Sequence, residues 1–372
     1  MTATVRVLPA EEIAAKAGGT TPPLRWPERA TFFAERAMRL RQLANGHAMG
    51  DFLQFTSRLA QAQQAALTGL GREGGIRIPD AVAIDRASMA GLPPMSAADW
   101  PRDPAWHGVL REIVQAMRDS TPAGPAADTL ARLAKADDVF LERQAEALLE
   151  GVMAGLDLAT APLIAAALQV LWTHGAIEVQ RAHAALGQTQ TLPVGKLDDA
   201  GICPCCGSRP VVSITRVAGE VTGQRYLHCS LCGTEWNVPR GQCTHCGVIG
   251  AEKISYQSLD RADDPSTARV KDSAEDSDES RARAEASEES SARAARATIQ
   301  AETCEACGHY LKIVHGDRDP FAEPAADDLA SITLDLLVAE TGQQRHGVNL
   351  MLLFGDPEGE PAAAPAAPPG GR

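Results

Sequence analysis

The sequence predicts an α+β multidomain protein: an N-terminal all-α domain, two small rubredoxin-like or zinc-ribbon β modules, and a C-terminal helix. Three observations lead to this fold class. The first half of the chain repeats apolar residues at helical spacing and contains no cysteine. All nine cysteines lie between residues 203 and 307, among alternating β-branched segments. A capped amphipathic segment follows the last cysteine pair.

Size and composition allow two folded domains but argue against a surface that follows nucleic-acid phosphates. The chain has 372 residues, 44% of them hydrophobic, which is enough for a well-buried core. Only 4% are aromatic, so that core must rest on alanine, leucine, isoleucine and valine. The formal net charge is -13, whereas nucleic-acid affinity needs clustered lysine and arginine.

The sequence shows no clear targeting or membrane segment. Its N-terminus lacks the apolar core of a secretory signal. The most apolar run, residues 156–172, is interrupted by Asp157, Pro162 and Gln169, so we expect a buried helix and no membrane insertion. A soluble, cytoplasmic protein is therefore predicted. In that compartment paired cysteines more often bind metal or do redox work than form structural disulfides.

Residues 23–198 are the predicted helical domain, preceded by a poorly ordered leader at 1–22. Asp51 is expected to cap the second helix of this domain. The stretch 85–105, rich in proline and alanine, predicts a connecting loop, after which helical patterns resume. Two apolar stripes are expected to be buried: Phe33, Ala37, Leu40 and Ala44 in the first helix, and Phe52, Phe55 and Leu59 in the second.

Residues 199–259 together with 297–318 are predicted to form a tandem cysteine-knuckle domain. RPVVSITRV and GEVTGQRYLHC indicate a first hairpin, and ISYQSL (254–259) and ATIQAETC (297–304) indicate the arms of a second. The segment between those arms, 260–296, is rich in Ala, Ser, Asp, Glu and Arg. It cannot bury enough surface to offset its ordering entropy, so we expect a disordered insertion at the hairpin tip. A single charged helix is the alternative.

One C-terminal helix is expected within 319–355, followed by a disordered tail at 356–372. The segment PAADDLASITLDLLVAETG has the pattern of a capped amphipathic helix, with Gly342 in the position of a C-cap glycine. Its expected buried face consists of Leu329, Ile332 and Leu336, with Leu337 beside them.

Eight of the nine cysteines fall into four copies of one unit, Cys-x-x-Cys-Gly. In a metal knuckle the loop turns tightly so that backbone N–H groups point at the sulfurs, and the glycine supplies positive φ at little cost. Two knuckles give the four thiolates of one tetrahedral site, so four knuckles predict two sites. The eight candidate metal ligands are Cys203, Cys206, Cys229, Cys232, Cys243, Cys246, Cys304 and Cys307.

Pairing the knuckles in chain order is the simplest arrangement, because each site then closes around its own hairpin. An interleaved pairing, first with third and second with fourth, stays open. The ninth cysteine, Cys205, lies inside the first knuckle as an inert spare, a slipped ligand or a reactive thiol, and the inert interpretation is favoured. His228, His245 and His309 adjoin the knuckles and are expected outside a closed four-thiolate shell.

The residues alone do not identify the metal. Four thiolates suit zinc and mononuclear iron equally. Zinc would make the sites structural and able to drive folding, whereas iron would make them rubredoxin-like and capable of one-electron change. Either ion leaves no open position for a substrate, and the sequence contains no G-x-S-x-G, P-loop or dinucleotide fingerprint. Hydrolysis catalysed by a bound metal ion is therefore disfavoured, and we predict a protein that acts by binding.

Five segments carry a resemblance to a known family: RLRQLANGHAMGDFLQFTSRLAQAQ (39–63), RYLHCSLCGTEW (225–236), CTHCG (243–247), ETCEACGHYLK (302–312) and DDLASITLDLLVAE (327–340). Through them the chain resembles, from about residue 23 to residue 355, the FdhE-type formate dehydrogenase accessory proteins of bacteria. The insertion at 260–296 and the Pro/Ala/Gly tail depart from the family pattern, but neither contains a candidate ligand.

The resemblance implies a factor for the maturation of respiratory formate dehydrogenase, and not an enzyme. Such a factor binds the molybdenum- or tungsten-containing catalytic subunit in the cytoplasm, before export. The resemblance also implies iron over zinc, with all eight paired cysteines carried over as ligands. One hypothesis follows: the metal domain senses or adjusts the redox state of the client, and the helical domain provides the docking surface.

Two other function classes remain open. A nucleic-acid-binding zinc ribbon uses the same knuckles, although the acidic balance and the scarcity of lysine near them count against it. An oxidoreductase, either a rubredoxin-like electron carrier or a thiol–disulfide enzyme, is the second class. Electron carriers are usually small, and metal occupancy would exclude thiol exchange.

Overall fold

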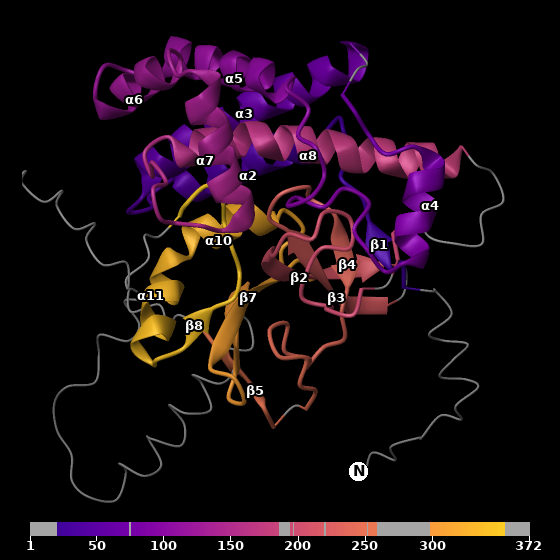
Figure 1. Ribbon diagram of the computed structural model, residues 1–372. Helices are drawn as coiled ribbons and strands as arrows, with labels where there is room; N and C mark the ends of the chain where they lie inside the picture. The colour runs from indigo at the N-terminus through magenta and orange to yellow at the C-terminus, as the bar shows by residue number, and fades with distance from the viewer. Residues whose placement is uncertain are drawn as a thin grey trace, which may run out of the picture.

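A layer of helices covers one end of a mixed β-sheet, and two short C-terminal helices lie beside the sheet (Figure 1). This computed structural model describes residues 21–73, 76–185, 194–195, 197–218, 221–250, 252–258 and 298–353. Most of the predicted leader, the whole insertion at 260–296 and the tail at 356–372 lie outside the described residues.

The helical layer is built mainly on one stripe of apolar residues per helix. The predicted face of α2 is buried, and its Arg36 is buried with it. At the centre lies α8, which is apolar on nearly all sides because it is surrounded by the other helices. The helices of this layer are α2 Phe32–Ala44, α3 Gly50–Glu73, α4 Ala81–Met89, α5 Trp106–Ser120, α6 Pro125–Leu133, α7 Asp138–Glu150 and α8 Ala161–Ala184.

Three local predictions for this layer need correction. Asp51 does not cap α3, because the helix already begins at Gly50 and Asp51 lies in its first turn. Of the stripe predicted for α3 only Leu59 is fully buried, while Phe52 and Phe55 pack at the margin of the core. The predicted loop at 85–105 begins inside α4, whose N-terminus is capped by the Asp80 carboxylate accepting from the Ala83 N–H.

Among the described helices, α8 is the one long and apolar enough to cross a membrane, and 89% of its most apolar window is buried inside the protein. The run predicted as a buried helix falls on α8, which starts at Ala161. The burial therefore identifies α8 as the central core helix of this layer.

One sheet contains both predicted β modules. Its strand order is β1-β4-β3-β2-β7-β6-β5, with β8 beside β7. The short β1 precedes the helices and pairs with β4, so the chain enters the sheet before it forms the helical layer. The strands are β1 Leu24–Arg25, β2 Pro210–Ala218, β3 Val221–Cys229, β4 Glu235–Asn237, β5 Ile254–Gln257, β6 Ile299–Cys304, β7 His309–His315 and β8 Gln344–Arg345.

The sheet is a tandem repeat. A knuckle, β2, β3, a second knuckle and β4 form the first module, and a knuckle, β5, β6, a fourth knuckle and β7 form the second. Both modules are antiparallel and cross the sheet in the same order. They meet where β2 pairs with β7 in parallel. Both predicted hairpins are therefore present, and the two modules are joined edge to edge.

The C-terminal region forms two short helices, α10 Pro324–Ala330 and α11 Ile332–Glu340, in place of the single helix predicted. The break falls at Ser331, whose hydroxyl donates to the carbonyls of Asp327 and Asp328 and competes with the helical hydrogen bonds. The break shifts the apolar face, so Leu336 and Leu337 are 59% and 46% exposed and were wrongly predicted as buried. The buried residues of α11 are Leu334, Asp335 and Val338.

Candidate metal centres

The four knuckles have the backbone that their sequence predicts. Gly207, Gly233, Gly247 and Gly308 have φ of 77°, 73°, 71° and 70°, which only glycine adopts without strain. In the second knuckle the N–H groups of Leu231 and Cys232 both point at Cys229 Sγ, at 3.4 Å. Such N–H···S contacts favour the charged thiolate over the neutral thiol.

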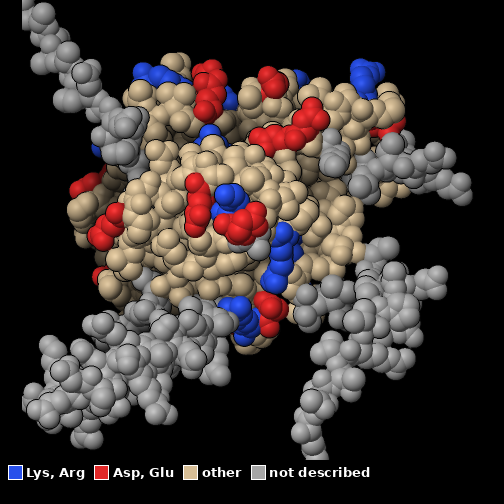
Figure 2. All heavy atoms as spheres, turned by 90° about the horizontal axis from the view of Figure 1, so that it is seen from below, with Lys and Arg blue, Asp and Glu red and all other residues tan. Residues whose placement is uncertain are grey.

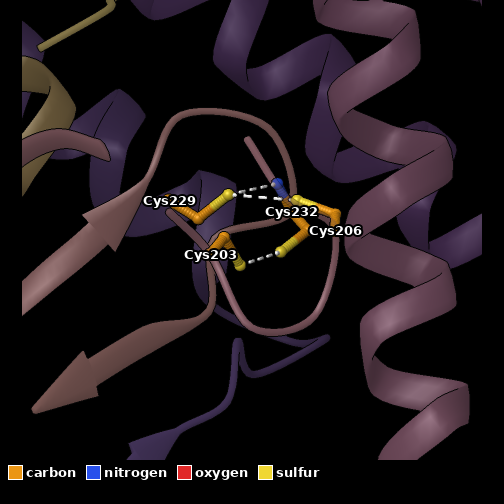
Figure 3. Close-up of side chains that lie close together, drawn as sticks. All are labelled: Cys203, Cys206, Cys229 and Cys232. Atoms are coloured by element: carbon orange, nitrogen blue, oxygen red, sulfur yellow. Dashed lines mark hydrogen bonds between the residues drawn. The ribbon is translucent and has the colours of Figure 1, made fainter. Parts of the chain in front are cut away.

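The first site consists of Cys203, Cys206, Cys229 and Cys232, and its sulfurs point toward one another from two loops (Figure 3). The Sγ atoms of Cys203 and Cys232 are 3.6 Å apart, and those of Cys206 and Cys229 are 3.4 Å apart. A disulfide would need about 2.05 Å. A metal–sulfur bond of about 2.3 Å gives a tetrahedron with edges of about 3.8 Å. The spacing fits a tetrahedral metal ion.

The first site lies in the same core as the helices. Its four cysteines are between 0% and 2% exposed. Gln169 of α8 donates from Nε2 to the Ser230 carbonyl in the second knuckle, at 2.7 Å. The N–H of Ala97, in the connection between α4 and α5, donates to the Cys206 carbonyl at 2.8 Å. An ion at the first site would therefore hold the helical layer to the sheet.

The protonation of the first site also indicates a cation. Burial raises the pKa of Cys203 and of Cys229. Burial opposes ionisation of Cys232 too, but hydrogen bonds from the neighbouring thiols lower the pKa of Cys232 well below its usual value. Four thiolates side by side need a positive ion among them.

The second site, Cys243, Cys246, Cys304 and Cys307, has the same geometry in a different setting. Its Sγ–Sγ distances are 3.7 Å for Cys243 with Cys307 and 3.8 Å for Cys246 with Cys304. Here Cys246 is exposed and Cys307 is half-exposed. The Val248 N–H lowers the pKa of Cys246 despite its partial desolvation. The second site is thus at the surface, whereas the first is enclosed.

The cysteines group in chain order: the two sets of four are the first knuckle with the second, and the third with the fourth. Each set surrounds its own hairpin, β2–β3 or β5–β6. Cys205, the ninth cysteine, is 1% exposed and belongs to neither set. A hydrogen bond with Cys232 and burial raise the pKa of the Cys205 thiol well above its usual value, which opposes the reactive-thiol interpretation.

The histidines beside the knuckles have different surroundings. His228 is buried, and its Nδ1 lies 3.2 Å from Glu235 Oε1. His245 and His309 stack at the second site with ring centroids 3.6 Å apart. His346, which the sequence analysis did not single out, lies edge-on to His245 at 5.3 Å. Burial lowers the pKa of His346 to about 4. No sequence signal marks His346, because only the pairing of β8 with β7 brings it there.

Comparison with known proteins finds relatives that match most of the chain. Residues 21–187 match the N-terminal domain of FdhE, residues 202–240 its central domain and residues 278–352 its C-terminal domain. The chain is 32% identical over 358 residues to the Protein FdhE homolog of Klebsiella pneumoniae subsp. pneumoniae, covering 95% of this chain and 99% of that protein. The chain belongs to the FdhE family. Protein FdhE of Escherichia coli O9:H4 is similar to the same extent.

A solved FdhE structure shares this fold. The crystal structure of the FdhE protein from Pseudomonas aeruginosa aligns with a TM-score of 0.65 and 31% identity, covering 89% of this chain and 99% of that one. The first site lies wholly within the central FdhE domain, and the second takes Cys304 and Cys307 from the C-terminal domain. The chain is thus an FdhE-type accessory protein with two four-cysteine clusters that can hold metal ions.

Proposed function

We propose that this FdhE-family protein acts in the cytoplasm in the maturation of respiratory formate dehydrogenase. It binds the molybdenum- or tungsten-containing catalytic subunit and acts through that binding, without catalysis of its own. The observation that carries the proposal is the pair of four-cysteine sets on a tandem ribbon, in a chain that matches FdhE proteins over nearly its full length. Each set is closed by its own four sulfurs, which leaves no open metal position for a substrate.

All eight paired cysteines are proposed as ligands, four to each ion, with iron favoured over zinc. The sulfur spacing suits both metals, so the preference for iron rests on the family. The two sites would then have separate roles. The enclosed first site would stabilise the fold, and the second site, with Cys246 at the surface, would be the one whose oxidation state a partner can sense. The helical layer would provide the docking surface.

A nucleic-acid partner is disfavoured by the distribution of charge as well as by its sum. Figure 2 shows the molecule from below, at the end opposite the helical layer of Figure 1. On this face the acidic and basic side chains lie in small mixed groups, and most of the described surface in view carries no charge. A surface that follows phosphates would gather its cations in one stripe.

Anaerobic affinity capture from the protein's own host tests the proposal. The tagged chain should recover the formate dehydrogenase catalytic subunit, with about two iron atoms per chain in the eluate by metal analysis. Recovery of the same catalytic subunit with zinc in place of iron would support the accessory role and would indicate that both metal sites are structural. Recovery of nucleic acid, or of no formate dehydrogenase subunit, would contradict the proposal.

The proposed redox sensing by the second site is tested separately. The affinity for the isolated catalytic subunit is measured with the bound iron oxidised and then reduced, under otherwise equal conditions. A difference is expected in the unsubstituted protein, and it should vanish in a Cys246→Ser variant that keeps the first site. Equal affinity for the two states in the unsubstituted protein would rule out redox sensing while leaving client binding intact.

A further inference from the structure

Next to the second site the structure gathers nitrogen donors that a closed four-thiolate site does not need. His245 lies between the two cysteines of the third knuckle, and His309 is two residues after Cys307. The side-chain donor atoms of His245, Cys307 and His309 all lie within 4.8 Å of one another. Two imidazoles and a thiolate are a donor set for a borderline divalent ion such as zinc, nickel or cobalt.

The tautomer of His309 suits a ligand. Its Nδ1 lies 3.0 Å from the Cys307 carbonyl oxygen, which can only accept. Nδ1 must therefore carry the proton, so Nε2 presents a lone pair. Metal-bound histidines usually hold their second nitrogen in this way, with the N–H donated to a carbonyl or carboxylate.

An unsatisfied buried group and a small cavity lie behind these donors. His346 is 7% exposed, and neither of its ring nitrogens has a hydrogen-bond partner among the described residues. A cavity of about 10 Å³ is lined by His245, His309 and His346, together with side chains of both hairpins. That volume holds about one water-sized ligand. A buried polar side chain without a partner, beside a cavity of this size, points to a missing ligand.

We propose that His245, Cys307 and His309 bind a third divalent metal ion beside the second four-cysteine site. The Cys307 thiolate, which has several lone pairs, is shared between the two ions. A water in the small cavity takes the fourth position and gives His346 its hydrogen-bond partner. The stacked rings are parallel, within 7°, and cannot both direct a lone pair at one ion. Because His245 is exposed and His309 is fixed by the carbonyl, His245 turns its ring when the ion binds.

Cobalt titration of the full-length protein, first reconstituted with two zinc ions per chain, tests the proposal. Equilibrium dialysis with metal analysis counts cobalt and zinc together. The expected result is one cobalt with two zinc retained, visible d–d absorption of a four-coordinate ion, and a thiolate-to-cobalt charge-transfer band. In a parallel titration with a third equivalent of diamagnetic zinc, proton NMR should show the ring signals of His245 and His309 move as the stack opens.

Variants separate this site from adventitious binding. His245→Asn and His309→Asn should each weaken cobalt binding at least tenfold, and His346→Phe should weaken it about 10- to 100-fold through loss of the outer hydrogen bond. All three should keep two zinc ions. His47→Gln, which removes a histidine far along the chain, should keep the third ion. Binding of no third ion by the unsubstituted protein, or equal binding by the double variant His245→Asn/His309→Asn, would overturn the proposal.

Discussion

At the scale of single residues, Cys205 tests whether the first site needs a fifth sulfur. Its thiol lies against Cys232 and is fully enclosed, yet the other four sulfurs already have tetrahedral spacing. Cys205→Ala should therefore keep two ions per chain and cost only about 1 kcal/mol of unfolding free energy, the usual effect of a small buried deletion. Cys206→Ala is the matched control and should lose the first ion.

Metal analysis and urea unfolding of the two variants make the measurement. Loss of an ion from Cys205→Ala, with the ion kept in Cys206→Ala, would show that the first knuckle uses its middle cysteine as a ligand.

A second residue, Glu235, joins three strands through its buried carboxylate. It pairs with Arg25 of β1, Arg216 of β2 and His228 of β3. Burial acts to raise the pKa of Glu235, but the charge of Arg216 and the hydrogen bond of His228 outweigh it and lower that pKa to about 2. Since the folded pKa lies below the unfolded one, this carboxylate stabilises the fold above about pH 4.3 and loses its contribution as the pH falls toward 2.

Glu235→Gln should lower the free energy of unfolding at pH 7 by about 3 kcal/mol, because it leaves the partly buried Arg216 with a neutral partner inside the sheet. The difference from the unsubstituted protein should shrink as the pH falls below about 4, where the unfolded carboxylate protonates. Urea unfolding at several pH values measures this difference in unfolding free energy. Acid also releases bound metal, but it does so in both proteins alike. Exposed Glu340→Gln is the control, expected within about 0.5 kcal/mol. A difference that grows in acid would contradict the assignment.

The local conformation of single residues was the part of the structure that the sequence predicted best. The four knuckle glycines have the positive φ that the turn requires, and this depends only on residues within each knuckle. His346 shows the limit. It reaches the second site through the pairing of β8 with β7 and the packing behind His245, and neither is encoded by the residues around it.

At the scale of elements, the two C-terminal helices show why a periodic pattern misplaces a buried face. A helical stripe keeps its phase only while the helix is unbroken. Ser331 ends α10 by bonding back to two carbonyls, and α11 starts with a new phase that buries Leu334 and Val338 and exposes Leu336. The long apolar stripe of α2 had no such break, and its predicted face was confirmed.

Buried charge attaches these helices to the sheet. Lys312 of β7 is fully buried, and its Nζ lies 2.8 Å from Asp328 Oδ1 of α10 and 2.6 Å from Asp335 Oδ2 of α11. Arg345 of β8 contacts the same two carboxylates. The cluster therefore joins four elements, β7, β8, α10 and α11, and each carboxylate is shared between two cations.

Lys312→Met removes one cation from this joint while keeping the volume of the side chain. We expect a loss of about 3 kcal/mol of unfolding free energy, at the low end for a broken buried pair because Arg345 still neutralises part of the charge. Urea unfolding of the metal-loaded protein measures it. Lys135→Met, at an exposed position of the helical layer, should change stability by less than about 0.5 kcal/mol. A neutral effect of Lys312→Met would show that the joint adds no stability over an apolar contact.

At the scale of the whole molecule, the arrangement of the modules could not be predicted from the chain. Each hairpin was predictable because its strands are local or are separated by a strongly polar insertion. The parallel pairing of β2 with β7 joins residues about a hundred positions apart, and β1 reaches β4 across the entire helical layer. Such pairings depend on how the preformed modules pack, so the sequence predicted two modules without showing that they form one sheet.

The different settings of the two sites lead to a prediction for the whole protein. The first site is enclosed by helices and sheet in one core, so its ion can leave only when that core opens. The second site has exposed Cys246 and belongs to a small separate cluster of buried side chains. A strong chelator should therefore remove the two ions in separate phases, the surface ion at least about tenfold faster, because local opening costs less free energy than global unfolding.

Release of the first ion should coincide with loss of the helical circular dichroism signal, and release of the second-site ion should leave that signal unchanged. Metal release followed by a colorimetric chelator, with circular dichroism recorded in parallel, measures both. The variant Cys246→Ser/Cys307→Ser should show the slow phase alone, which assigns the fast phase to the second site. Release of both ions in one phase, together with the helical signal, would mean that the tandem modules unfold as one unit and that the exposed site has no independence from the core.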